Sequence, residues 1–161
     1  LNINISAKQV VDARFVLDVA GLLRSSGLPA AALTLELTET VLVHDPVVAR
    51  RHLTELKDLG VRISVDDFGT GYSSLSHLRE FPVDEIKIDR TFMTDFAKTR
   101  ENQLKVKEIC DQAHAQSKLT IAEFVEDAAS MSILFTLGVN FVQGNFLQEP
   151  EKVMAYEMAG A

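Results

Sequence analysis

The most restrictive feature of this sequence is the alternation of short, β-branched apolar runs with longer amphipathic segments. Strands that alternate with helices form parallel sheets joined by right-handed crossovers, either in an open doubly wound sheet or in a (β/α) barrel. The sequence therefore predicts an α/β fold. The apolar runs predict strands at residues 1–5, 33–39, 61–65, 85–89, 119–123 and 141–144.

Capping residues and glycines mark the expected helices between these strands. Ser6 and Gly27 delimit the first helix, and Asp45-Pro46 opens the second, which ends at Gly60. The expected helices cover residues 6–27, 45–60, 75–79, 101–116 and 127–138, with a terminal helix from about Pro150.

Each predicted strand carries a polar or charged residue near its carboxyl end. The crevice of an open sheet draws on two or three strands, whereas a barrel gathers all its strand ends around one mouth. The pattern therefore favours a TIM-like (β/α) barrel with a site at that mouth. The residues in question are Asn4, Glu36, Asp66 with Asp67, Lys87, Glu123 and Gln143.

The number of strands is too small for a closed barrel. Six strands are predicted where a barrel of this type has eight. We therefore expect an incomplete barrel that lacks its first strands, with edges covered by preceding sequence or by another chain. Because the chain begins without Met inside a strand pattern, we expect residues 1–161 to be one N-terminally truncated domain.

Two adjacent carboxylates, Asp66 and Asp67, follow the third predicted strand and precede a glycine-rich loop. Like charges this close favour protonation of one group unless a cation lies nearby, and a divalent metal would meet that need. From this segment alone, a polar turn with self-capping aspartates explains the residues equally well.

Composition narrows the function classes. A formal net charge of −7 and a pI near 5.1 argue against a nucleic-acid polymer as partner. The single Cys110 excludes an internal disulfide and indicates a reducing compartment, with the thiol acting as a small buried hydrophobe. No apolar run is long enough to span a bilayer, so we expect a cytoplasmic protein or the cytoplasmic part of a membrane-anchored one.

Six segments in order resemble the motifs of the EAL-domain family, which consists of bacterial cyclic di-GMP phosphodiesterases on a TIM-like barrel. The name-giving Glu-Ala-Leu segment would precede Leu1, in agreement with the strand count. The segments are Asn4-Ile5-Ser6-Ala7-Lys8-Gln9, Glu36-Leu37-Thr38-Glu39, Asp66-Asp67-Phe68-Gly69-Thr70-Gly71-Tyr72-Ser73-Ser74-Leu75, Lys87-Ile88-Asp89, Ala122-Glu123 and Gln143-Gly144.

The resemblance implies a role for each matching residue. Lys87, Asp66, Asp67 and Glu123 match catalytic positions, and Lys87 is expected to position or polarise the attacking water, although a lysine there could also be a salt-bridge partner of Asp89. Glu39 would anchor the loop after Asp67. The implied metal ligands are Asn4, Glu36, Asp66 and Asp67, for Mg²⁺ or Mn²⁺ with inhibition by Ca²⁺; Asp89 and Gln143 would lie near the ligand.

Two residues depart from the family pattern. Phe124 stands where the family usually has glycine, and Asn145 replaces the usual aromatic residue. Phe124 could stack on a guanine base or be a core aromatic near the mouth, and we favour stacking because a strand end faces the site.

The resemblance predicts metal-dependent hydrolysis of cyclic di-GMP to linear pGpG. The alternatives are a degenerate, non-catalytic cyclic di-GMP receptor and a structural dimerisation unit. It also implies a homodimer fused to upstream sensory or GGDEF-type domains. We expect the 161-residue chain alone to have little activity because part of the barrel and one metal ligand would precede it.

Overall fold

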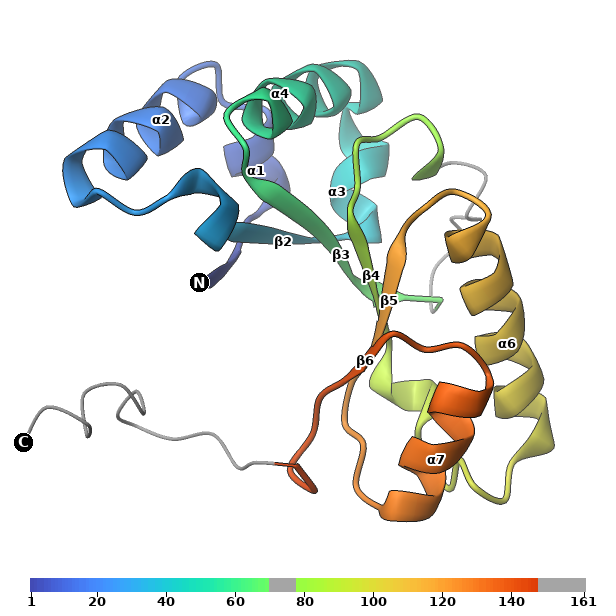
Figure 1. Cartoon of the computed structure of the whole chain (residues 1–161). Helices are drawn as coiled ribbons and strands as arrows, with labels where there is room; N and C mark the ends of the chain where they lie inside the picture. The colour runs from blue at the N-terminus through green and yellow to red at the C-terminus, as the bar shows by residue number, and fades with distance from the viewer. Residues whose placement is uncertain (70–77, 148–161) are drawn as a thin grey trace, which may run out of the picture.

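The computed structural model describes residues 1–69 and 78–147, which contain one parallel sheet of six strands (Figure 1). Spatial order follows chain order, so β1 and β6 lie at the two edges and the sheet is not closed. The predicted α/β fold, an incomplete barrel of six strands, is confirmed. The strands are β1 (Asn2–Asn4), β2 (Thr34–Thr38), β3 (Arg62–Phe68), β4 (Glu85–Ile88), β5 (Leu119–Ala122) and β6 (Phe141–Val142).

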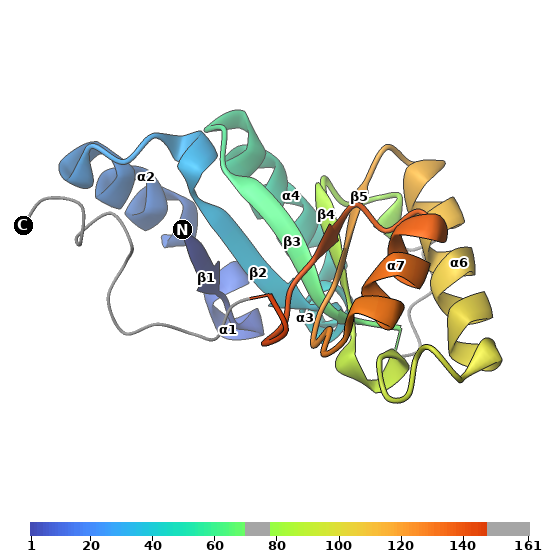
Figure 2. The ribbon, with the colours of Figure 1, turned by 60° about the horizontal axis from the view of Figure 1, so that its bottom comes forward.

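The helices lie along the outer side of the curved sheet (Figures 1 and 2). Alternate strand residues pack beneath them in the core, where Leu35, Ile63 and Ile86 are at most 2% exposed. None of the described helices is long and apolar enough to cross a bilayer. The helices are α1 (Ala7–Val10), α2 (Phe15–Ser26), α3 (Glu39–His44), α4 (Pro46–Asp58), α6 (Arg100–His114) and α7 (Ala128–Thr136), with 3-10 turns η1 (Ala30–Ala32) and η2 (Arg90–Phe92).

The first predicted helix is wrong in one respect, because the chain forms α1 and α2 instead of one continuous helix. Ser6 does cap α1, in a reciprocal arrangement with Gln9. The chain then turns at residues 11–14, where the Asp12 carboxylate accepts a hydrogen bond from the backbone N–H of Arg14 at 2.8 Å. Gly27 ends α2 in the left-handed conformation, as its position predicted.

Several strand ends differ from the prediction, and two of these differences affect the arrangement of the site residues. β2 ends at Thr38, so Glu39 begins the unpredicted helix α3, which is only six residues long and gives too short a period to detect. β3 continues to Phe68, which places Asp66 and Asp67 inside the strand. Most of the expected helix at 75–79, the loop residues 70–74 and the terminal helix after Pro150 lie outside the described residues.

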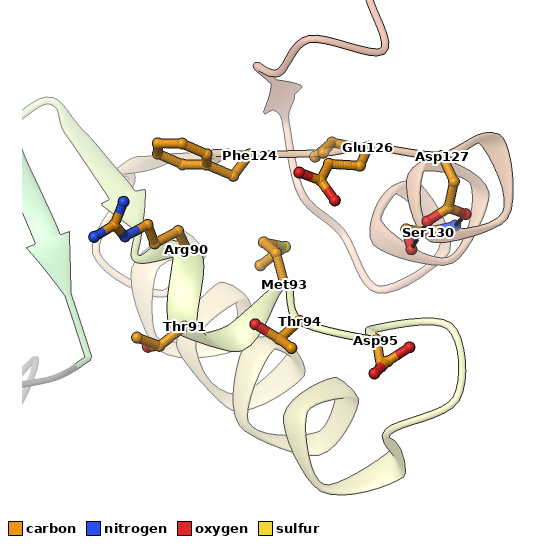
Figure 3. Close-up of a pocket in the computed structure, with 10 residues that line it drawn as sticks. Arg90, Thr91, Met93, Thr94, Asp95, Phe124, Glu126, Asp127 and Ser130 are labelled. Carbon is orange, nitrogen blue, oxygen red and sulfur yellow. Dashed lines mark hydrogen bonds between the residues drawn. The ribbon is translucent and has the colours of Figure 1, made fainter.

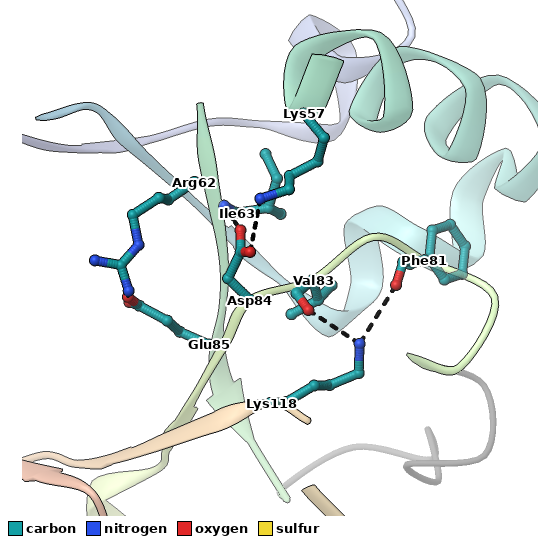
Figure 4. Close-up of polar contacts among 8 residues, drawn as sticks. All are labelled: Lys57, Arg62, Ile63, Phe81, Val83, Asp84, Glu85 and Lys118. Carbon is teal, nitrogen blue, oxygen red and sulfur yellow. Dashed lines mark hydrogen bonds and ion pairs between the residues drawn. The ribbon is translucent and has the colours of Figure 1, made fainter. Parts of the chain in front are cut away.

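Charged side chains pair at the amino end of the sheet (Figure 4). The Asp84 carboxylate accepts hydrogen bonds from Lys57 Nζ at 2.6 Å and from the backbone N–H of Ile63 at 2.8 Å. Arg62 on β3 forms an ion pair with Glu85 on β4. These contacts join α4, β3 and the start of β4 at the end of the sheet opposite the strand tips.

Lys118 completes this region from the start of β5. Its side chain is buried, and Nζ donates hydrogen bonds to the carbonyl oxygens of Val83 at 3.0 Å and Phe81 at 3.4 Å. Burial lowers the pKa of Lys118, while the charge of Asp84 acts in the opposite direction. We refer to Lys57, Arg62, Asp84, Glu85 and Lys118 as the amino-end cluster.

Candidate functional site

Lys87 on β4 brings together acidic side chains from three other segments at the carboxyl end of the sheet. Its Nζ lies 2.7 Å from Glu123 Oε1, 3.2 Å from Glu36 Oε2 and 3.6 Å from Asp66 Oδ1. In-register parallel strands place these residues on one face, because side chains alternate with a period of two. Among the described ion pairs of Lys87 there is none with Asp89, the alternative partner considered from the sequence.

The surroundings of Lys87 fix its charge. Burial alone lowers the pKa of Lys87, but the hydrogen bond and charge of Glu123, with the charges of Asp66 and Glu36, outweigh burial and raise the pKa above the ordinary value. Lys87 is therefore protonated at neutral pH. It can serve as a fixed positive charge and hydrogen-bond donor.

A β-bulge positions the adjacent carboxylates of Asp66 and Asp67. The β3–β4 register shifts between Val65 and Phe68, and Asp67 adopts a left-handed conformation with φ 53°. Asp66 Oδ1 also accepts a hydrogen bond from the Asp67 backbone N–H at 2.9 Å. Neighbouring residues of a regular strand point to opposite faces, so the bulge is what allows both carboxylates to serve one site.

The bulge places Asp67 near Asp89 at the end of β4. Burial raises the pKa of Asp67 most, and the charges of Asp66 and Asp89 with a side-chain hydrogen bond to Asp89 raise it further. The Asp89 side chain is buried and accepts a hydrogen bond from the Thr91 backbone N–H at 2.8 Å. Asp89 thus both caps η2 and adds a carboxylate to the site.

Glu36 on β2 is held from two sides. Its Oε1 accepts a hydrogen bond from Asn2 Nδ2 at 2.8 Å, while Oε2 faces Lys87. Sequence reasoning selected Asn4, which is exposed and lies opposite Glu36 in the β1–β2 register, but missed Asn2. The two asparagines are two residues apart and share a face of β1, which is the signal that could have identified Asn2.

Glu39 lies beneath the start of the glycine-rich loop. Its Oε1 accepts a hydrogen bond from the Gly69 backbone N–H at 3.1 Å, the contact that an anchor of this loop requires. Gly69 has φ 103°, and a Cβ atom there would lie 2.7 Å from Phe92 Cε2. Only glycine fits this position without displacing Phe92.

The segment after β5 carries Glu123 and Phe124. Burial raises the pKa of Glu123 most, its hydrogen bond to Lys87 and the charge of Lys87 act in the opposite direction, and the charge of Asp66 adds to the increase. Phe124 is 50% exposed and has φ 53°, with the Arg90 guanidinium 5.4 Å from the ring centroid. The sequence did not single out Arg90, although it follows Asp89 directly.

Gln143 is exposed, and its backbone joins β6 to β5. Its N–H donates a hydrogen bond to the Ala122 carbonyl oxygen at 2.8 Å, and its own carbonyl oxygen accepts from Val125 N–H at 3.1 Å. A Cβ atom on Gly144 would lie 2.3 Å from the Val125 carbonyl oxygen, so this close backbone approach requires glycine.

Negative charge dominates this end of the sheet. In the described ranges, Lys87 is the cation in contact with the carboxylates. No group of three or more His, Cys, Asp or Glu side chains among the described residues is arranged to hold a metal by itself. We refer to Glu36, Asp66, Asp67, Lys87, Asp89 and Glu123 as the carboxyl-end cluster.

Comparison with known proteins identifies the family of this chain. A family model described as the EAL domain matches residues 1–150. The chain belongs to the EAL domain family. The resemblance seen in the motifs is therefore confirmed over nearly the whole chain.

Known proteins of the EAL domain family resemble this chain in sequence, and solved structures resemble it in fold as well. The cyclic di-GMP phosphodiesterase PdeR of Escherichia coli is 36% identical over 155 residues, covering 96% of this chain and 23% of PdeR. The structure of the PaMucR phosphodiesterase in complex with c-di-GMP matches with a TM-score of 0.88 and 36% identity, covering 98% of this chain and 63% of that chain.

A second solved structure, the EAL domain of Mycobacterium smegmatis DcpA, matches with a TM-score of 0.89 and 39% identity, covering 98% of this chain and 70% of that one. The chain spans 18% of the length of one curated relative, the signaling protein YkoW of Bacillus subtilis, and 24% of another, the protein Rv1354c of Mycobacterium tuberculosis. Those relatives therefore contain much sequence outside the region of similarity.

Proposed function

We propose that this chain carries the site of a metal-dependent phosphodiesterase that opens cyclic di-GMP to linear pGpG. The observation that carries the proposal is the carboxyl-end cluster, in which one protonated lysine stands among five carboxylates. Such an excess of negative charge repels a phosphodiester unless divalent cations intervene. Named cyclic di-GMP phosphodiesterases among the relatives support the substrate assignment.

The oxygen ligands of the cluster fit Mg²⁺ or Mn²⁺. The implied ligands offer carboxylate oxygens and one amide oxygen, from Asn4, Glu36, Asp66 and Asp67. Hard cations prefer such oxygen ligands to the nitrogen and sulfur ligands of zinc sites. Mg²⁺ usually binds through one or two carboxylates and completes its shell with water and substrate phosphate. That preference agrees with the lack of a complete protein cage among the described residues.

Bound cations would supply Lewis-acid activation of water and charge neutralisation of the phosphodiester. In the reaction, a water oxygen forms a bond to phosphorus, the bond from phosphorus to the ribose 3′-oxygen breaks, and the departing oxygen takes up a proton. In this proposal, Lys87 donates a hydrogen bond to the attacking water or to a phosphate oxygen, and its positive charge stabilises the transition state. Glu123 and Glu36 hold the Lys87 ammonium in place.

The test is product analysis with the full-length protein. We expect cyclic di-GMP to be converted to pGpG in Mg²⁺ and to be bound without turnover in Ca²⁺. Asp66→Asn should lower kcat by about 10²–10³-fold, the typical effect of removing one electrostatic contact to a transition state. Glu85→Gln is the matched control, because Glu85 lies on the same strand as Lys87 but pairs with Arg62. Equal loss in both variants would refute the assignment of the site.

A non-catalytic cyclic di-GMP receptor is the second candidate. The specific observation in its favour is Phe124, which adopts φ 53° where the sequence comparison led us to expect glycine. Such a side chain beside Glu123 could favour retention of the ligand over turnover. Binding in both Ca²⁺ and Mg²⁺ without appearance of pGpG would support this candidate against the enzyme.

Membership of the family also leads us to propose a homodimer and fusion to upstream sensory or GGDEF-type domains. The low coverage of the curated relatives is compatible with additional domains. Analytical ultracentrifugation of the full-length protein, with and without cyclic di-GMP, tests the dimer.

A further inference from the structure

A cavity of about 500 Å³ lies next to the carboxyl-end cluster, between the segment after β4 and the segment after β5 (Figure 3). Arg90 and Phe124 line it, and each directly follows a residue of the cluster, Asp89 and Glu123 respectively. The volume lies within the range of small-molecule sites. Two residues that line the cavity are therefore adjacent in sequence to the proposed catalytic site, but none of the carboxyl-end cluster residues lines the cavity.

The lining of this cavity disfavours a phosphate and favours a neutral group with N–H donors. Three carboxylic side chains, Asp95, Glu126 and Asp127, line it together with Thr91 and Thr94. In Figure 3 the Glu126 carboxylate points into the space between the two segments. Carboxylates and hydroxyls accept hydrogen bonds from a nucleobase, whereas the three carboxylates repel an anion.

Phe124 is the distinctive residue of this cavity. Its backbone lies in the left-handed region at φ 53°, a conformation that is unfavourable for a bulky side chain, and its ring is 50% exposed. Half-exposure means that burial of the ring contributes only part of what a core phenylalanine would contribute. A strained residue that gains little from packing is a candidate for a functional contact.

The Arg90 side chain contacts the Phe124 ring. The guanidinium carbon lies 5.4 Å from the ring centroid, within the range of a cation–π contact. The guanidinium lies over one face of the ring, so a base would have to stack on the opposite face. An aromatic face with a cation behind it is a suitable stacking surface for a planar, electron-rich base.

We propose that the Arg90–Phe124 pair is a base-stacking platform, and that one guanine base of cyclic di-GMP stacks on Phe124 at the mouth of this cavity. The inference rests on the proposed function, because it places the base of the same ligand whose phosphodiester lies at the carboxyl-end cluster. Stacking on a remote aromatic ring binds substrate and transition state equally, so its loss changes KM and not kcat.

The experiment is a titration of the full-length protein with cyclic di-GMP in Ca²⁺. Phe124→Leu should weaken binding by roughly tenfold to a hundredfold, the usual contribution of one stacked base. Phe124→Trp should retain affinity within about threefold, because it keeps an aromatic face. Phe135→Leu is the matched control, because Phe135 on α7 is 49% exposed and does not line the cavity. In Mg²⁺, Phe124→Leu should raise KM with little change in kcat.

A second variant separates stacking from folding. Phe124→Gly should weaken binding as much as Phe124→Leu does. It should nevertheless unfold at the same urea concentration as the unchanged protein or at a higher one, because glycine adopts φ 53° without strain. Binding of Phe124→Leu equal to that of the unchanged protein would overturn the platform while leaving the proposed function intact. Absence of binding by the unchanged protein would overturn both. A urea midpoint for Phe124→Gly below that of the unchanged protein would show that the ring is kept for packing.

Discussion

The two ends of the sheet both hold charged side chains, but they differ in how these charges are paired. In the amino-end cluster, three cations face two carboxylates, and Lys118 is satisfied by backbone carbonyl oxygens. In the carboxyl-end cluster, the described residues set Lys87 against five carboxylates. At the amino end of the sheet the charged groups therefore have partners within the protein. At the carboxyl end the described residues leave an excess of negative charge.

The difference separates scaffold from site. A network whose charges and hydrogen-bonding groups are all paired stabilises the fold and leaves no excess charge for a ligand to neutralise. A cluster with excess negative charge pays an electrostatic penalty in the free protein, which bound cations would relieve. In barrels of this type the carboxyl end of the strands carries the chemistry and the amino end the stability, and the two clusters follow that division.

The largest expected effect is the response of the two ends to divalent cations. Addition of Mg²⁺ at 100 times its Kd should raise the unfolding free energy by about 2.7 kcal/mol, since a ligand that binds only the folded state stabilises it by mass action. Asp66→Asn should lose most of this increase, and Asp84→Asn should retain it. Urea unfolding in Mg²⁺ and in EDTA measures both, and an equal response in the two variants would abolish the contrast.

The same pair of substitutions should have unlike effects on the metal-free protein. Asp84→Asn removes a charged partner of Lys57 and turns an amide towards either Lys57 or the Ile63 N–H, so we expect a loss of about 1–3 kcal/mol. Asp66→Asn keeps an oxygen to accept from the Asp67 N–H and reduces the charge excess, so stability should hold or rise. Urea unfolding in EDTA decides the sign, and a loss of equal size at Asp66 would mean that the carboxyl end is also scaffold.

The carboxyl-end side of this contrast was accessible from the sequence, whereas the amino-end cluster was not predicted. The reason for the success is the period of two in strands. Glu36, Asp66, Lys87 and Glu123 each stand near the end of a predicted strand, so parallel order was enough to bring them together. The bulge at Asp67 was not predictable, because it depends on how β3 pairs with β4, a contact between segments far apart in the chain.

Other misses have similar physical causes. The helix α3 is too short to give a periodic signal, and its position is set by packing of Val41 and Leu42 into the core. Asn2 bonds to Glu36 only because β1 lies beside β2 in this register. The contact between Arg90 and Phe124 joins two loops that the sequence places 34 positions apart.

The smallest expected effect concerns an acid at the carboxyl end that belongs to the scaffold. Asp127 caps α7, and hydrogen bonds from the Ser130 backbone N–H and hydroxyl lower the pKa of Asp127 below its ordinary value of 3.8. A lowered pKa means that the capping contribution is present above the ordinary value and is lost as pH falls through the folded-state pKa. Asp127→Ala should therefore lower Tm by a few degrees at pH 7 and by less in strong acid.

Asp127→Asn is the matched control, because asparagine caps helices about as well as aspartate and does not titrate. Its Tm at pH 7 should stay close to that of the unchanged protein. The kcat for cyclic di-GMP should remain within about threefold in both variants, since Asp127 lines the cavity proposed for the base and is not part of the carboxyl-end cluster. Scanning calorimetry at pH 7 and pH 3 with parallel product assays makes the comparison. A large loss of turnover in Asp127→Asn would move this residue from the scaffold to the site and narrow the contrast between the two ends.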